Sequence, residues 1–460
     1  MRGNGKAGSD PLAGFKIRGW RKREASAGRA ADGSDAAFGR ILANTAWLLG
    51  GKGVGAVLSL FYLAIITRTL GVADFGRFAL ITSTAQAISV LVTFESWQIV
   101  VRFGQTHLQG GAPHALNRLI RFCILIDMAS ALAGCAIAAG IVILLGPWLG
   151  LSDDLSAHAL LFCAVMLIGI RSTPMGMLRL FDRFDTGTLA ETVVPVVRMV
   201  GALVVLASGP SVTRFLMVWG AAELLCAGAY WVLALRTVRG RIGSWRSGQI
   251  WAARDENPGL VGFLTATNLS TTFSSAGKQV AVLIVGLFTG PVGAGLYRLA
   301  YQLNQALAKI SQLLSRTVFA ELSRASACNN MDDLRALLRR TNRLALVSGA
   351  AIVVLVLLTG QPLLRLIAGP SFDGAYPILL VLGIAAAIEV VGLGFGPLLM
   401  ATGRTSRALQ ISLATTALLL TAQTLLLPIH GPIGAAYANV LAAIVGLALL
   451  GWASRAAIRR

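Results

Sequence analysis

Long apolar stretches alternate with short polar breaks along almost the whole chain after residue 40. A helix that crosses a bilayer needs about 20 mostly apolar residues, and the stretches between the breaks reach this length. The pattern predicts an all-α polytopic membrane protein with about 12 transmembrane helices. These are expected near residues 41–65, 78–101, 120–145, 158–178, 186–207, 213–235, 260–288, 296–317, 344–364, 377–400, 407–428 and 434–454.

Composition leaves no room for a sizeable soluble domain. Of the 460 residues, 55% are hydrophobic and only 13% are charged, whereas a soluble globular chain has about 25% charged residues. A net charge of +20 would suggest nucleic acid as the partner of a soluble protein. In a membrane protein the same charge reports topology and attraction to anionic lipid, so we expect membrane lipid and no nucleic acid as a partner.

The distribution of basic residues predicts the orientation. Residues 1–40 carry nine Lys or Arg against four Asp or Glu, without apolar periodicity, which is typical of a disordered basic cytoplasmic tail. With twelve helices, alternate connections and the two ends hold 30 basic residues on one side and four on the other. The positive-inside rule then places both termini of this multi-pass protein in the cytoplasm.

Two segments at a constant offset of 219 residues suggest a duplication. "TLGVADFGRFA" (residues 69–79) and "FTGPVGAGLYRLA" (288–300) share Gly71/Gly290 and Gly76/Gly295, and each lies between two apolar helices. The alternative is that glycine-rich turns between membrane helices often look alike. With a duplication, the chain divides into the tail at 1–40, a six-helix bundle at 41–235, a basic cytoplasmic linker at 236–257 and a second bundle at 258–455.

Charged groups at membrane depth need a partner or a watery cavity, because each costs about 2.5–3.5 kcal/mol at the bilayer centre. Glu191 and Arg198, seven residues apart, share a helix face and are expected to belong to one structural ion-pair network, while Arg171 is expected to meet Glu95 or Asp127. The eighth expected helix differs, because six polar residues at spacings of four and three share one of its faces. They are Arg298, Gln302, Gln305, Lys309, Gln312 and Arg316.

Neighbouring helices extend this polar stripe. The seventh carries Lys278 on a polar face, the first carries Lys52, and the matching face of the second, around Gln86, is polar but neutral. We predict a hydrated cationic lumen that binds a phosphate-bearing anion. The alternative is an interfacial surface or a homodimer contact. The candidate substrate-binding residues are Lys52, Lys278, Arg298, Gln302, Gln305 and Lys309.

The sequence carries no motif for a zinc site or for nucleotide hydrolysis. The five cysteines lie far apart, without the CxxC or Cys/His spacing of a zinc site, and a Walker-type phosphate loop is absent. We expect no metal, no cofactor and no catalytic residue, so the chain is predicted to be a transporter rather than an enzyme.

"RTLGVADFGRFALITS" (residues 68–83) resembles the R-x-LG-x-x-x-FG-x-F signature of bacterial polysaccharide transporters, the Wzx-type lipid-linked oligosaccharide flippases of the MOP superfamily. "GMLRLFDRFDTGTLAETVVPVVRMVGALV" (176–204), "ATGRTSRAL" (401–409) and "GPIGAAYANV" (431–440) are also similar, and the resemblance covers about residues 40–455.

The resemblance implies two pseudo-symmetric six-helix bundles around a central cavity in the bacterial inner membrane. It also implies alternating-access transfer of an undecaprenyl-pyrophosphate-linked oligosaccharide to the periplasmic leaflet, for exopolysaccharide, capsule or O-antigen synthesis. A polysaccharide polymerase and export proteins would then be partners. The positions that match the family's lumen are Lys52, Lys278, Arg298 and Lys309.

Two other functions stay open from the sequence. A multidrug or organic-cation exporter of related architecture would need acids in the lumen, and Glu95, Asp127 and Glu389 lie within expected helices. An integral-membrane glycan polymerase would usually place catalytic residues in a large periplasmic loop, whereas every outer connection here is short.

Overall fold

A computed structural model of the chain describes residues 33–146, 153–242, 248–326, 331–392, 395, 399 and 405–458, and regular structure within these ranges is helical. Two compact units are distinguished, Met1–Gly53 and Val54–Arg460. The first unit contributes the start of the long helix α2. The rest of α2 and the other described helices belong to the second unit.

The described residues of the first half form seven helices up to the mid-chain linker, where a short eighth follows. Their bounds are α2 Gly33–Val92, α3 Ser96–Gln109, α4 Pro113–Leu145, α5 Asp153–Ile168, α6 Ser172–Leu180, α7 Phe184–Ser208, α8 Val212–Val238 and α9 Ala252–Glu256. Those of the second half include five helices and a 3₁₀ turn. These are α10 Leu260–Ser326, α11 Met331–Ala368, η2 Pro370–Phe372, α12 Ala375–Gly392, α14 Thr405–His430 and α15 Pro432–Ile458.

Ten stretches of the described residues are long and apolar enough to cross a membrane. Two of them, Gly55–Gln109 and Gln279–Ala306, contain a glycine with non-helical backbone angles. These are Gly71 (φ 70°, ψ −178°) and Gly290 (φ 70°, ψ −173°). Backbone of this kind is open essentially only to glycine, because it has no Cβ.

The chain reverses at Gly71. Tyr62 and Phe78 both contact the ring of Trp219, with centroids 5.0 and 5.2 Å away, although 16 residues of straight helix would separate them by about 24 Å. α10 has the same backbone angles at Gly290, and its 67 residues would span about 100 Å if straight, far more than a bilayer core. α2 and α10 therefore supply two crossings each, which confirms the prediction of about 12 transmembrane helices.

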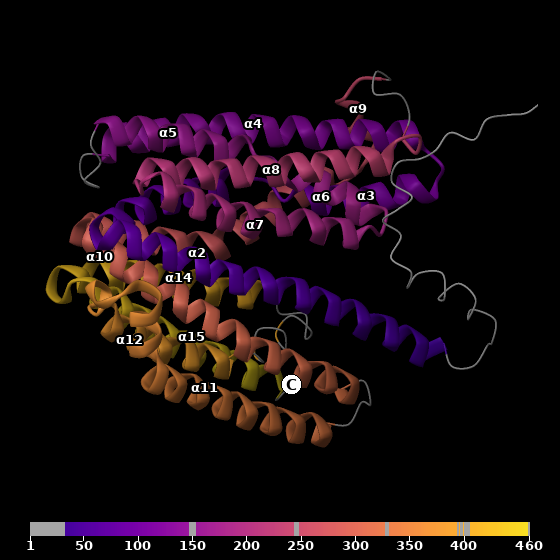
Figure 1. Ribbon diagram of the computed structural model, residues 1–460. Coiled ribbons are helices and arrows are strands. Elements are labelled where there is room, and N and C mark those ends of the chain that lie inside the picture. Colours follow the sequence, from indigo (N-terminus) through magenta and orange to yellow (C-terminus); the bar gives the residue numbers. More distant parts are fainter. Residues whose placement is uncertain are drawn as a thin grey trace, which may run out of the picture. The chain divides into compact units, whose positions relative to one another are not determined.

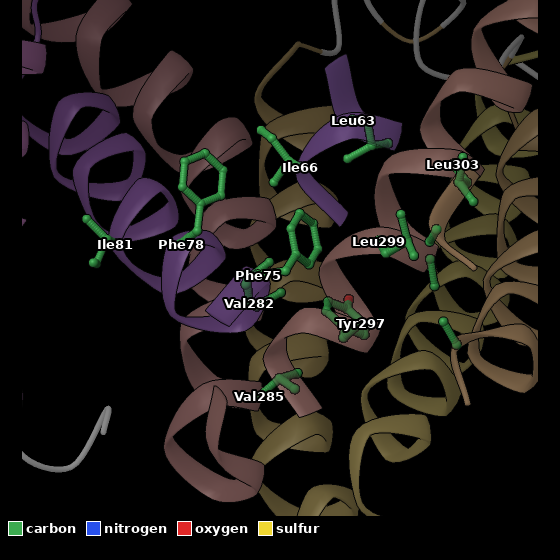
Figure 2. Close-up of a cluster of buried hydrophobic side chains, with 14 of the residues drawn as sticks. Leu63, Ile66, Phe75, Phe78, Ile81, Val282, Val285, Tyr297, Leu299 and Leu303 are labelled. Carbon is green, nitrogen blue, oxygen red and sulfur yellow. The ribbon is translucent and has the colours of Figure 1, made fainter. Parts of the chain in front are cut away.

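The helices of Val54–Arg460 pack as two sets (Figure 1). Helices α3 to α8 contact one another, and α10, α11, α12, α14 and α15 contact one another. A continuous apolar core joins α2 to α10, and Figure 2 shows this contact from close by. Its labelled side chains are Leu63, Ile66, Phe75, Phe78 and Ile81 from α2, with Val282, Val285, Tyr297, Leu299 and Leu303 from α10.

Two of the expected helices are broken in the middle. The span expected near 78–101 is interrupted between Val92 and Ser96, and the one near 158–178 between Ile168 and Ser172. Asp127 of α4 accepts hydrogen bonds from both new helix starts: from the Ser96 hydroxyl (2.9 Å), and from the Thr173 hydroxyl and amide (2.6 and 3.3 Å). A buried carboxylate at two helix N-termini satisfies amide and hydroxyl donors that each break exposes.

The ends of the predicted segments differ from the structure or lie outside it. α2 begins at Gly33 rather than near 41, in a segment that contains the strong helix formers Ala36 and Ala37. The rest of the predicted tail, residues 1–32, lies outside the described residues. In the linker, residues 243–247 are also outside them, and the Arg118 guanidinium of α4 pairs with Glu256 of α9. The predicted boundaries of the two bundles remain a prediction.

Candidate substrate-binding cavity

A small cavity of about 50 Å³ lies where α2 meets α7, α8 and α10. Both arms of α2 contribute, because the reversal at Gly71 brings residues 62–66 and 75–86 to the same place. The described lining is Tyr62, Leu63, Ile66, Phe75, Phe78, Ala79, Thr82, Gln86, Arg198, Trp219, Arg298 and Gln302. Two arginines, two amides, a hydroxyl and an aromatic wall thus face one space, and this described lining contains no carboxylate.

Arg298 lies on the second arm of α10, and its Nη2 donates to the Gln86 side-chain oxygen on α2, 3.4 Å away. Gln302 follows one turn later on the same face and also lines the cavity. Within the described part of the chain, Arg298 has no carboxylate within ion-pair distance. A guanidinium with an uncharged partner at membrane depth is a ready anion ligand.

Arg198 of α7 enters the same cavity from the other half of the chain. Its guanidinium carbon lies 4.7 Å from the centroid of the Trp219 ring, within cation–π range. Its Nη2 donates to Glu223 of α8 at 2.8 Å. Within the described residues Glu191 takes no part in these ion pairs, contrary to the expected network. Glu191 accepts a hydrogen bond from Tyr230 at 3.3 Å, because α8, rather than the next turns of α7, supplies the partners.

The expected partners of Arg171 are also wrong. Its Nη2 pairs with the second oxygen of Glu223, at 2.9 Å. Glu95 accepts from the Trp97 indole and Asp127 from Ser96 and Thr173. One buried carboxylate therefore serves two arginines.

Of the six candidate residues, the structure brings Arg298 and Gln302 into the cavity. Gln305 lies outside the cavity lining and donates to the Tyr301 hydroxyl at 3.0 Å. The side chains of Lys52, Lys278 and Lys309 lie outside the described residues, so their role remains a prediction.

Sequence reasoning missed Arg198 and Trp219 as cavity residues. The acid seven residues before Arg198 on the same helix favours a structural ion-pair network for it instead. A pattern on α8 could have predicted both residues. Trp219 and Glu223 are four residues apart and share one helix face, so their indole ring and carboxylate can bind a cation together.

Beside the cavity, α2 and α10 meet through glycines. A Cβ added to Gly76 would lie 1.7 Å from the Pro291 carbonyl oxygen, and one added to Gly295 would lie 2.7 Å from that of Val72. The two contacts are reciprocal, because residues 72 and 291 are themselves related by the offset of 219. These contacts form a glycine seam that joins the two turns.

A cluster of three or more His, Cys, Asp or Glu side chains suited to a metal ion does not occur among the described residues. The chemistry that this cavity offers is recognition: two guanidinium groups and two amides for an anion, and aromatic faces for an apolar or sugar ring.

Sequence comparison fixes the family. A family model described as "Polysaccharide biosynthesis protein" matches residues 41–320, more than half of the chain. The chain belongs to the polysaccharide biosynthesis protein family. The inner membrane protein YghQ of Escherichia coli (strain K12) is a relative of this chain. The two are 28% identical over 371 residues, which cover 80% of this chain and all of YghQ.

Solved structures share the fold of this polysaccharide biosynthesis family member. The lipid II flippase MurJ in an inward closed conformation matches with a TM-score of 0.70 and 13% identity, over 89% of this chain and 87% of MurJ. A multidrug resistance MATE transporter of the MOP superfamily, in an inward-facing conformation, matches with a TM-score of 0.69 and 12% identity, over 87% and 96% of the two chains. The chain is thus a multi-pass, all-α membrane protein with two pseudo-symmetric bundles.

Proposed function

We propose that this protein is a flippase that moves an undecaprenyl-pyrophosphate-linked oligosaccharide from the cytoplasmic to the periplasmic leaflet of the bacterial inner membrane. The observation that carries the proposal is the pair of arginines, Arg198 from one half and Arg298 from the other, in one cavity whose described lining has no carboxylate. Guanidinium groups are suited to phosphate oxygens. Membership of a polysaccharide biosynthesis family, together with the MurJ-like fold, supports a lipid-linked glycan as cargo.

The transport cycle needs no bond to be made or broken. With both termini in the cytoplasm, the turns at Gly71 and Gly290 lie at the periplasmic side, and the glycine seam closes that side. The anionic head group enters from the cytoplasm and supplies the counter-charge for Arg198 and Arg298. The halves then rock about the two turns and release the glycan outside, while the lipid tail stays in the bilayer.

An organic-cation exporter is less consistent with the same cavity. Cation recognition needs acids in the lining, and the described lining contains two arginines instead. Glu223 already holds two arginines, and Asp127 is hydrogen-bonded to two helix starts. A deletion strain that accumulates more cationic dye, with unchanged polymer output, would favour the exporter.

Reversing the charge of Arg298 tests the proposal. In a host that depends on this flippase, Arg298→Glu should lower polymer export by about 100-fold and trap lipid-linked repeat units inside, because two charge-assisted hydrogen bonds are replaced by repulsion. Arg298→Lys keeps the charge but loses the planar fork, and should retain about a tenth of the export.

Arg407→Glu is the matched control, because Arg407 is exposed on α14 and lies outside the cavity lining. It should export normally. Export is read from cell-surface polymer, and the amount of folded protein from size-exclusion chromatography. Normal export by folded Arg298→Glu would overturn the proposed function.

A further inference from the structure

The carboxylate of Glu223 is divided between two arginines. Its Oε1 accepts from Arg198 at 2.8 Å and its Oε2 pairs with Arg171 at 2.9 Å, while the residue is only 6% exposed. Each oxygen is therefore used by a different guanidinium. One negative charge faces two positive charges in a region where an unbalanced charge is costly.

Two side chains of α8 hold the Arg198 guanidinium in place. Trp219 and Glu223, one turn apart on this helix, contact the guanidinium through the indole ring and a carboxylate oxygen respectively. The Arg198 Nε is buried and has no hydrogen-bond partner among the described residues. The guanidinium is thus held in the cavity wall with part of its hydrogen-bonding capacity unused.

The charges around the cavity do not cancel. Arg171, Arg198 and Arg298 with Glu223 leave a net charge of about +2 at neutral pH, since arginine stays protonated and the glutamate is paired with two cations. A phosphate monoester carries close to two negative charges at this pH, but it presents them at one point. A head group with two phosphates can place one beside Arg198 and the other beside Arg298.

We propose that Glu223 is a positioning residue that holds Arg198 in the cavity wall and competes with an anionic head group for it. This inference rests on the proposed function. A phosphate oxygen must displace the Glu223 carboxylate from Arg198, after which Glu223 stays paired with Arg171. Every head group that binds Arg198 meets this cost, whether it has one phosphate or two. A diphosphate also gains Arg298, so it binds more tightly than a monophosphate.

The test compares two probes, farnesyl monophosphate and farnesyl diphosphate, on the full-length protein in lipid nanodiscs. The wild-type protein should bind the diphosphate at least about tenfold more tightly, the value of one charge-assisted hydrogen bond. Glu223→Gln keeps the side-chain shape and removes the competing charge. It should raise the affinity for both probes about tenfold and leave the ratio of the two dissociation constants unchanged, because Arg298 sets that ratio.

A second variant predicts the opposite sign. In Arg171→Gln the whole Glu223 carboxylate becomes available to Arg198, so the binding of both probes should weaken about tenfold. Glu191→Gln is the matched control. It removes another glutamate of the same half, one whose carboxylate accepts from Tyr230 rather than from an arginine, and both affinities should stay at the wild-type value.

The outcomes separate the two proposals. If the wild-type protein binds neither probe, the anionic substrate of the proposed function is wrong. If it binds both, and folded Glu223→Gln keeps the wild-type affinities, the role of Glu223 is overturned. Should Glu223→Gln fail to fold, Arg171→Gln decides alone, and unchanged affinities in that variant contradict the inference.

Discussion

The two reversing turns of the molecule share a backbone but differ in chemistry. Gly71 and Gly290 have the same φ of 70°, and each is followed five residues later by a glycine that packs on the opposite arm. Three residues after these packing glycines, at equivalent positions, Ala79 and Arg298 both line the cavity. The repeat has kept the small residues that the turn needs, while one copy carries the charge.

This difference separates folding from recognition. A glycine at a reversal or at a close helix contact is fixed by sterics, which act alike on both copies. The residue type at a cavity position is constrained by the ligand. A ligand that lies between the two halves needs only one arginine from each half. Arg198 supplies the charge of the first half from α7, rather than from the turn that corresponds to Arg298.

The largest expected effect comes from breaking the seam. In Gly76→Ala the new Cβ would lie 1.7 Å from a backbone oxygen of α10, so the closed contact should be destabilised by about 3 kcal/mol, the upper end for overpacking. Export should fall about 100-fold. In a cysteine-free background, a cysteine at Thr82 in the cavity should react faster with a membrane-impermeant maleimide added outside.

Gly228→Ala is the control for this variant. Gly228 lies within α8, and an added Cβ would meet nothing within 4 Å, so export should stay normal. Gly76→Ala with full export and unchanged labelling would show that the seam does not close the periplasmic side.

An intermediate effect tests whether the two turns are equivalent. A Cβ at Gly71 or Gly290 meets no atom within 4 Å, so only the backbone conformation opposes an alanine there. Each Gly→Ala change should lower the free energy of unfolding in detergent by about 2 kcal/mol, within the range for glycine-only backbone. Denaturant titration measures both, and a difference above about 1 kcal/mol would argue against a true duplication.

The sequence predicted the parts of the fold that depend on local rules. Apolar length predicted the crossings, and the offset of 219 paired Gly71 with Gly290. Helical spacing predicted that Arg298 and Gln302 share a face, and both line the cavity.

What the sequence did not predict depends on contacts between distant segments. The break before Ser96 is tied to Asp127, 31 residues away. The partner of Arg198 lies 25 residues away on α8, while an equally plausible acid lies on its own helix. Choosing between them requires knowing which helix packs on α7, and no local pattern encodes that.

The smallest effect concerns an ion pair at the end of α11, in the second half. Arg365 donates to both oxygens of Asp373 at 2.8–3.2 Å, and these hydrogen bonds hold the pKa of Asp373 below its ordinary value of 3.8.

A carboxyl whose pKa is lowered by folding stabilises the folded chain fully above its ordinary pKa, and this contribution is lost as the pH falls through the lowered one. The melting temperature of Asp373→Asn should therefore lie slightly below wild type at neutral pH, and the gap should close in acid as the pH falls through the lowered pKa of Asp373. Both side chains are exposed to solvent, so about 0.5 M salt should also narrow the gap. A gap that persists in acid would mean that Asp373 supports the end of α11 through packing rather than through its charge.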